Sequence, residues 1–305
     1  MSDTVAARQR ELHDVMERFI ERRRRAFLPE ARRIAADAGV SESVLLFLVF
    51  TRQLTRNGDI PLAGLRRRAV YATTEPWRPR LDAAVAAGLA EAAPAGWRLT
   101  ARGREVVDRA WEAIAAQQRA LPLPAGPLGR VVDTLEGIVR DVPATPDQRL
   151  AFIRNTAPAD RAAASLAARA EQGMFETAVL HDDGHIGAWE DAGYDGPTLD
   201  VLTHVWRGCA TRAALSERLG RGQTEADLDR AIGVLAQRGE LTREGEALAL
   251  TPAGAASRTA IEAETDRRGF ARWPRGAALE ALIADVEALV AALPAAEDLP
   301  AGPTH

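Results

Sequence analysis

The 305-residue sequence contains no lysine, so all 39 of its basic residues are arginine. Cysteine occurs once, at Cys209, which excludes an internal disulfide and gives no sign of an oxidising compartment. Aromatic residues are scarce, with 7 Phe and 2 Tyr, whereas alanine and leucine are abundant, a balance that favours helix over sheet. No apolar run approaches the roughly 20 residues of a membrane-spanning helix, and Asp3, Glu11 and Asp14 argue against a signal peptide. We therefore expect a mainly helical, cytoplasmic protein without a membrane partner.

Motifs of the common catalytic sites are also missing. The sequence has no G-x-S-x-G elbow, no H-E-x-x-H motif, no phosphate-binding glycine loop and no paired cysteines. The short stretch Gly220-Arg221-Gly222 is interpreted as a turn because it is too short for a nucleotide fingerprint. We therefore expect a protein that is not an enzyme and that holds no cofactor and no metal.

Charge is distributed unequally along the chain. Residues 1–130 hold 22 arginines against 15 acidic residues, a net charge of +7, and the remainder holds 17 against 28, a net charge of −11; together they give the overall −4. A polyanion is attracted to the first part and repelled by the second. We expect the two parts to have different tasks.

Two segments roughly 150 residues apart follow the same pattern. In the first, an amphipathic helix ends at Gly88, a short hairpin follows, and Leu99-Thr100-Ala101-Arg102-Gly103 opens the next helix. In the second, the helix ends at Gly239 and the next one opens at Leu250-Thr251-Pro252-Ala253-Gly254. A recognition helix, two wing strands and a Thr-capped helix are the closing elements of a winged helix. The sequence therefore predicts a mainly α fold with tandem winged helix-turn-helix domains, flanking long amphipathic helices and small two-stranded wings.

Several prolines interrupt the middle of the chain, and they place the expected domain boundary near residues 143–148. The predicted division is a DNA-binding and dimerisation domain over 1–145, a ligand-binding or interaction domain over 146–295, and a disordered tail over 296–305. Within it we expect a helix over 5–38 broken at Pro29 and helical structure over 148–192 interrupted around 181–187. The second wing, Thr242 to Leu250, is expected to be longer than the first.

The first part resembles MarR-type regulators over about 130 residues. The resemblance is carried by the element order and by Gly88-Leu89-Ala90-Glu91 followed by the stretch from Trp97 to Glu105. It implies that the long helices after the wing pair two subunits and place two recognition helices about one DNA turn apart. The wing departs from the family pattern, since it is reduced to Pro94-Ala95-Gly96-Trp97-Arg98, and this puts insertion into the minor groove in doubt.

The second part, about 149–295, resembles an actinobacterial helix-turn-helix family that carries an H-R-x-D-G-H stretch. The matching residues are His181-Asp182-Asp183-Gly184-His185, in which Asp182 replaces the arginine, followed by the segment from Leu250 to Arg267. The resemblance implies a second winged helix and brings no activity with it.

Candidate DNA contacts lie at the N-terminal end of the first recognition helix, in the short helix before it and in the wing. In a helix-turn-helix the recognition helix meets base edges at this end, and arginine suits both guanine and phosphate. The alternative is that these arginines are ordinary solvated surface. The candidates are Arg66, Arg67, Arg68, Thr73, Thr74, Trp77, Arg78, Arg80 and Arg98.

The second recognition helix begins with three acidic residues, Glu225, Asp227 and Asp229, which would repel phosphate. Acidic residues in a first helical turn also complement the helix dipole, and this stabilising role is the plainer explanation. We expect this module to pack, to bind a ligand or to contact a protein rather than to read DNA alone.

The segment 181–185 is the densest cluster of titratable side chains. Its two histidines are four residues apart, a spacing at which they could share one face of a helix and, with a carboxylate or with His204, bind a metal. Gly184 weakens the helix that this arrangement needs. A capped helix break is the plain alternative, and a small-molecule site is the favoured functional one. The candidate ligand residues are His181, Asp183, His185, Trp189, Tyr194 and Trp206.

Three functions remain open from the sequence. The first is a dimeric, effector-responsive transcriptional regulator that binds double-stranded DNA through residues 41–105. The second is a protein that binds a drug or metabolite for sequestration or self-resistance. The third is a DNA glycosylase of the self-resistance type, for which no glutamine-centred catalytic motif is found.

Overall fold

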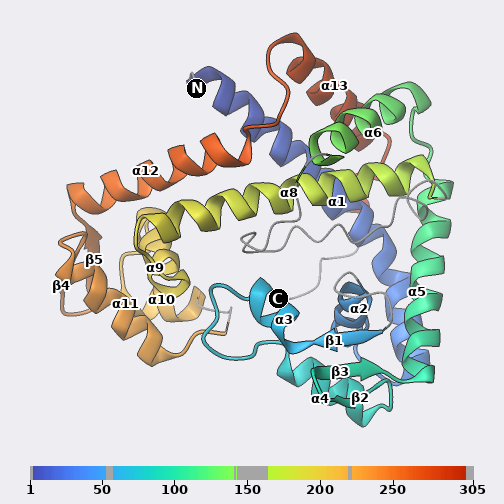
Figure 1. Cartoon of the computed structure of the whole chain (residues 1–305), viewed down its shortest axis with the longest axis horizontal. Helices are drawn as coiled ribbons and strands as arrows, with labels where there is room; N and C mark the ends of the chain where they lie inside the picture. Colours follow the sequence, from blue (N-terminus) through green and yellow to red (C-terminus); the bar gives the residue numbers. More distant parts are fainter. Residues whose placement is uncertain (1–2, 53–57, 141, 143–163, 219–221, 300–305) are drawn as a thin grey trace.

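The chain folds into two winged-helix modules joined by a helical core (Figure 1). The computed structural model describes residues 3–52, 58–140, 142, 164–218 and 222–299. The elements of the first half are α1 (Asp3–Ala38), α2 (Glu42–Thr51), β1 (Asp59–Pro61), α3 (Leu62–Arg68), α4 (Arg78–Ala86), β2 (Ala90–Ala93), β3 (Gly96–Leu99), α5 (Ala101–Ala120) and α6 (Ala125–Arg140). Those of the second half are α8 (Leu166–Asp191), α9 (Gly196–Trp206), α10 (Arg212–Arg218), α11 (Glu225–Gln237), β4 (Leu241–Glu244), β5 (Ala247–Leu250), α12 (Pro252–Gly269), α13 (Ala277–Ala291) and the short 3₁₀ helix η1 (Ala296–Asp298).

The two halves repeat the same order of elements. Each has a long helix, three helices of a helix-turn-helix, a two-stranded wing and two further helices. In the first module β1 adds a third strand, with the order β1-β3-β2 and Pro61 opposite Gly96. In the second module an isolated bridge between Thr211 and Ala247 stands in the corresponding place. The predicted tandem winged-helix fold is confirmed, and the whole described chain is an internal duplication.

The same closing motif explains why each wing leads into a helix. The Thr100 hydroxyl donates to the carbonyl of Gly88 at 2.7 Å and accepts from the Gly103 amide at 3.0 Å. Thr251 makes the corresponding bonds to Gly239, at 2.7 Å, and from Gly254, at 3.1 Å. Each threonine therefore caps its helix and ties it to the end of the recognition helix.

The apolar residues form three cores. The first module's core combines the second half of α1 with α2, α4, α5 and the small sheet. The second module's core combines the end of α8 with α9, α11, the wing and α12. A third core lies between them and buries residues of α1, α6, α8 and α13, together with Phe270 and Trp273 after α12.

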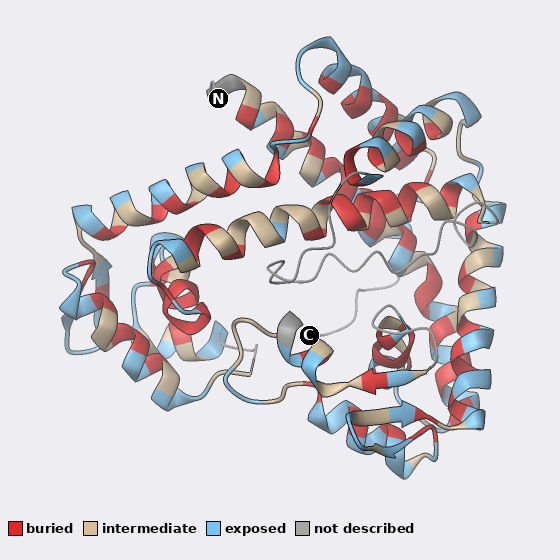
Figure 2. Cartoon of the chain, in the orientation of Figure 1, coloured by how far each residue is buried: buried red, intermediate tan, exposed pale blue. Residues whose placement is uncertain are grey.

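Pairing in the third core follows the duplication. In element order α1 corresponds to α8 and α6 to α13, and the structure packs α1 on α13 and α8 on α6. The two pairs meet where α6 contacts α13 and α1 contacts α8. Figure 2 shows buried residues concentrated where α6, α8 and α1 come together, with exposed residues on the outer faces of both modules. The predicted domain boundary at 143–148 lies outside the described residues, and the third core draws on both sides of it.

Three local predictions are wrong. Helix α1 continues through Pro29, because the buried residues Phe27, Leu28 and Ala31 on either side hold it against the core. Helix α8 runs unbroken through the segment 181–187. The wings are equal, with two four-residue strands each. After α13 the described chain continues through η1, and Arg25 donates to the carbonyl of Leu299 at 3.1 Å.

The described helices were compared with the length and apolar character that crossing a membrane requires. No single helix among them meets both requirements, whereas the pair Val5–Ala38 and Glu42–Thr51, bent by 98°, meets them only when taken together.

Candidate nucleic-acid interface

Helix α4, the first recognition helix, starts later than predicted. It begins at Arg78, and Trp77 is its N-cap residue, without a side-chain capping bond. Trp77 is only 5% exposed and belongs to the first module's core. This burial removes its ring from the surface that DNA can reach.

Two of the candidate arginines share one carboxylate. Glu75 accepts from Arg66 at 3.1 Å and from Arg78 at 2.6 Å. Desolvation opposes the effect, but the hydrogen bonds from Arg78 and Arg66 lower the pKa of Glu75 overall. The Arg78 guanidinium also lies 4.6 Å from the centre of the Trp97 ring in the wing. These contacts hold both guanidinium groups in place beside the start of α4.

The arginine surface faces solvent. The side chains of Arg66 and Arg78 are 64% and 44% exposed. Arg80 is exposed and its side chain makes no hydrogen bond or ion pair to another described residue, and Arg98 in the wing pairs with Glu91 at 2.6 Å. Arg67 and Arg68 lie on α3, and their side chains are outside the described part of the structure. The structure thus brings Arg66 and Arg78 together at Glu75 and leaves Arg80, two residues further along α4, exposed.

Thr73 and Thr74, predicted as DNA contacts, instead bond to the second module. Their backbone amides donate to the carbonyl of Gly222 at 3.0 and 2.9 Å, and the Thr74 hydroxyl donates to the same oxygen at 2.7 Å. The Thr73 hydroxyl donates to the carboxylate of Asp227 at the start of α11. The predicted cap of the first recognition helix is therefore a contact between the modules.

The rest of the loop before α4 strengthens this contact. The side-chain amide (Nε2) of Gln223 donates to the backbone carbonyl of Tyr71 at 3.0 Å, and the Tyr71 ring lies 6.2 Å from that of Trp189. A Cβ at Gly196 would lie 2.1 Å from the carbonyl oxygen of Val70, so only glycine fits there. The loop consequently contacts Gly222 and Gln223, the two residues before the cap of α11.

The N-terminal region of α11 has the opposite charge to that of α4. Arg212 is paired with Asp229 at 2.7 Å and with Glu225 at 2.9 Å, and Asp227 completes a capping box with Thr224. Asp229 stands as many residues before Gly239 as Arg78 stands before Gly88. The acidic residues therefore stabilise the helix start, as the sequence suggested, and leave little positive charge for phosphate.

The histidines of the 181–185 cluster face helix α12. The ring of His181 lies 4.8 Å from that of Phe270, and His185 Nδ1 is 2.9 Å from the Thr265 hydroxyl. A Cβ at Gly184 would lie 2.9 Å from the amide nitrogen of Gly269, so this glycine permits close packing of α8 and α12 instead of breaking the helix. Burial is the main cause that lowers the pKa of both histidines to about 4.

The other predicted ligand residues do not gather around this pair. Trp189 and Tyr194 are buried in the second module's core, where Tyr194 donates to Glu240 at 2.6 Å. Trp206 is 44% exposed and lies 5.3 Å from the guanidinium carbon of Arg258. Asp183 is half-buried on α8.

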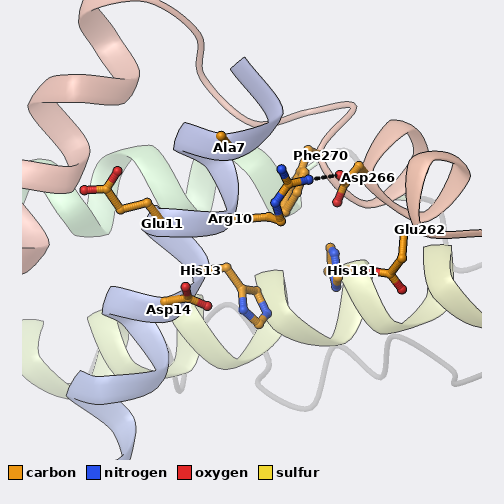
Figure 3. Close-up of a pocket in the computed structure, with 9 residues that line it drawn as sticks. All are labelled: Ala7, Arg10, Glu11, His13, Asp14, His181, Glu262, Asp266 and Phe270. Atoms are coloured by element: carbon orange, nitrogen blue, oxygen red, sulfur yellow. Dashed lines mark hydrogen bonds and ion pairs between the residues drawn. The ribbon is translucent and has the colours of Figure 1, made fainter. Parts of the chain in front are cut away.

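His181 instead lines a pocket that the sequence did not indicate. The pocket has a volume of about 430 Å³ and lies between α1, α8 and α12 (Figure 3). Its residues come from distant parts of the chain, and no spacing in the sequence connects them. They are Ala7, Arg10, Glu11, His13, Asp14, His181, Glu262, Asp266 and Phe270.

One group beside this pocket has the proximity that a metal site requires. Ligand atoms of His13, Asp14 and Glu17 lie within 4.8 Å of one another. Asp14 and Glu17 are exposed, and exposed acidic groups commonly approach one another in this way without an ion. The alternative considered from the sequence, His181 with His185 and His204, does not form such a group within the described residues.

These features define a protein of tandem winged helices, in which α4 begins among exposed arginines and α11 among acidic residues. Residues 180–300, less than half of the chain, match a helix-turn-helix family. The match spans the end of α8, the whole second module, α12 and α13, and it confirms the predicted helix-turn-helix character of this part. Comparisons with curated proteins and with solved structures gave no match. Proteins with this motif are, as a class, DNA-binding.

Proposed function

We propose that the chain is a MarR-like transcriptional regulator that binds double-stranded DNA through its first module. The observation that carries the proposal is the exposed surface of Arg66, Arg78 and Arg80 beside the start of α4. The N-terminal end of a recognition helix is the part that contacts base edges, and neighbouring arginines bind DNA phosphates and so fix the orientation of the helix on the duplex. The helix-turn-helix match in the second half supports the general class of DNA-binding regulator.

The second module serves this function as a support. The loop that leads into α4 contacts the start of α11 through the bonds of Thr73 and Thr74 to Gly222 and of Thr73 to Asp227. Its arginine at the corresponding surface, Arg212, is neutralised by two carboxylates. The acidic module thus fixes the position of the first recognition helix and remains away from phosphate.

Removal of the two arginine charges at the start of α4 is expected to weaken DNA binding. In the variant Arg78→Ala/Arg80→Ala, affinity for a duplex selected from a random pool should fall at least about tenfold, because a good arginine–base contact is worth roughly 1–3 kcal/mol. Fluorescence anisotropy at low salt measures the affinity, and the wild-type affinity should fall steeply as salt rises.

The matched control is Arg230→Ala/Arg243→Ala in the second module. Both arginines lie on exposed positions of α11 and β4, and their removal should leave the affinity within about twofold. The proposal is contradicted if no duplex is retained at low salt, or if the control pair weakens binding as much as the first pair does.

The duplication also bears on the oligomeric state. Of the two long helices that the MarR resemblance assigned to pairing with a second subunit, α6 packs within the same chain on its equivalent helix α13 and on α8. The apolar residues of α6, including Val131, Val132 and Leu135, are fully buried by this packing. We propose that the chain contains both halves of a dimer-like arrangement and acts as a monomer, in place of the homodimer that the sequence suggested.

The monomer is a direct prediction. Light scattering coupled to size-exclusion chromatography should give a mass near 32.8 kDa over a wide range of concentrations. Since the apolar faces of α6 and α13 are already covered, dilution should cause no dissociation and no loss of helix signal. A mass of twice this value that persists on dilution would show that another surface forms a dimer.

A further inference from the structure

The pocket between α1, α8 and α12 combines an aromatic wall with acidic groups. Four rings follow one another, with centroid separations of 5.0 Å from His13 to His181, 4.8 Å from His181 to Phe270, 4.7 Å from Phe270 to Trp273 and 6.3 Å from Trp273 back to His13. Phe270 is fully buried. The rings of His13, His181 and Phe270 line the pocket, and that of Trp273 packs against them.

The charged residues of the pocket are mostly acidic. The lining includes Glu11, Asp14, Glu262 and Asp266, and Figure 3 shows Arg10 as the one arginine drawn and the Glu11 carboxylate pointing away from the other side chains. Outside the lining, Arg8 binds Glu11 and Arg258 binds Glu262, whereas Asp14 has no ion pair within the described part of the chain. Because burial lowers the pKa of His181 to about 4, its imidazole adds no positive charge at neutral pH.

Asp266 is the central carboxylate. Its side chain is 9% exposed, and its ion-pair partner is Arg10, whose side chain reaches from α1 and is 51% exposed. Burial raises the pKa of Asp266, although Arg10 opposes this effect. A buried carboxylate whose charge is balanced by a single exposed guanidinium also accepts strongly from another cation that takes the place of that guanidinium.

We infer that this pocket binds a small aromatic amine, whose ammonium group replaces Arg10 at Asp266 and whose ring packs against His13 and His181. The volume of about 430 Å³ lies within the range of small-molecule sites. A ligand cation gains from the carboxylates and from the faces of the aromatic rings, and an anion is repelled by the same groups. The inference goes beyond the proposed DNA-binding function, because the binding requires no DNA.

Three probes of similar size test the chemistry, namely 2-phenylethylamine, 2-phenylethanol and 3-phenylpropanoate. Ligand-observed NMR and calorimetric titration with the full chain should detect saturable binding of the amine. The alcohol should bind at least about tenfold more weakly, as expected for the loss of a charge-assisted contact, and the carboxylate should not bind.

Two variants should move the affinity in opposite directions. Asp266→Asn should weaken binding of the amine at least about tenfold, whereas Arg10→Ala should tighten it, because the competing guanidinium is gone. The matched control is Asp285→Asn, since Asp285 is a carboxylate of 11% exposure that pairs with the exposed Arg130 away from the pocket. It should bind the amine as the wild type does.

Thermal unfolding separates a binding effect from a folding effect. Asp266→Asn should remain folded, because burial already favours the uncharged form of this side chain. The inference is overturned if the amine shows no saturable binding, if the alcohol binds equally well, or if the folded Asp266→Asn variant keeps wild-type affinity. None of these outcomes affects the DNA-binding test, which uses a different surface and a different ligand.

Discussion

Acidification from pH 7 to pH 4 is expected to destabilise the fold by several kcal/mol through two histidines. Burial lowers the pKa of His181 and of His185 from the usual 6.5 to about 4. The unfolded chain therefore takes up these two protons as the pH falls below about 6.5, whereas the folded chain stays unprotonated until about 4. Stability is unaffected by these groups above pH 7 and is lost progressively over this window, by up to roughly 3 kcal/mol for each histidine.

Urea unfolding at a series of pH values measures this dependence. The variant His181→Gln/His185→Gln lacks both titrating groups, and its stability should change much less than that of the wild type between pH 6.5 and pH 4. The comparison uses the slopes, so a uniform loss of stability in the variant does not disturb it. Parallel slopes in the two proteins would show that the histidines are not held neutral by the packing of α8 on α12.

Two glycines, Gly103 and Gly254, occupy equivalent positions at the start of the helices that follow the wings. Substitution of either should unfold its module. A Cβ at Gly103 would lie 1.9 Å from the carbonyl oxygen of Leu89, and a Cβ at Gly254 would lie 2.1 Å from that of Glu240. Both obstacles are backbone atoms, so no side-chain rotation relieves them. We expect Gly103→Ala and Gly254→Ala each to cost about 3 kcal/mol or more, at the upper end of overpacking.

Gly137→Ala and Gly233→Ala are matched controls. Both glycines lie within helices, α6 and α11, and a Cβ at either meets no atom within 4 Å. These changes should stabilise the chain by about 0.5–1 kcal/mol, the helix-propensity difference between glycine and alanine. Thermal and urea unfolding provide the measurement. Near-wild-type stability of Gly103→Ala or Gly254→Ala would mean that the wing does not close on the recognition helix as described.

The features predicted correctly from the sequence are those with local causes. The caps at Thr100 and Thr251 and the glycines that end α4 and α11 act within one helix and its hairpin, so their pattern in the chain reveals them. The acidic start of α11 was likewise correctly interpreted as a stabilising first turn. The winged helices could therefore be located before the structure was known.

The errors arise where tertiary packing overrides a local signal. Gly184 and Pro29 disfavour a helix on their own, but close contact with α12 and burial beside Pro29 stabilise α8 and α1. Thr73 and Thr74 have the composition of a helix cap, yet their partner is Gly222, far away in the sequence. A local pattern contains no information about such a partner.

The shared core and the pocket could not be predicted for the same reason. The pairing of α1 with α13 and of α8 with α6 depends on how the two halves meet, which the duplication of elements alone does not state. The pocket joins His13, His181 and Asp266 from three separate helices. Among the residues proposed from the sequence for a ligand, His181 lies there because it faces α12.

Hydrogen–deuterium exchange of the full chain, with and without a selected duplex, tests the central claim most directly. If the basic module binds DNA while the acidic one supports it, the duplex should slow exchange in α4 and in the wing strands β2 and β3, and leave α11, β4 and β5 unchanged. Slower exchange confined to α11 and its wing, or no change in either module while the duplex is bound, would contradict this account.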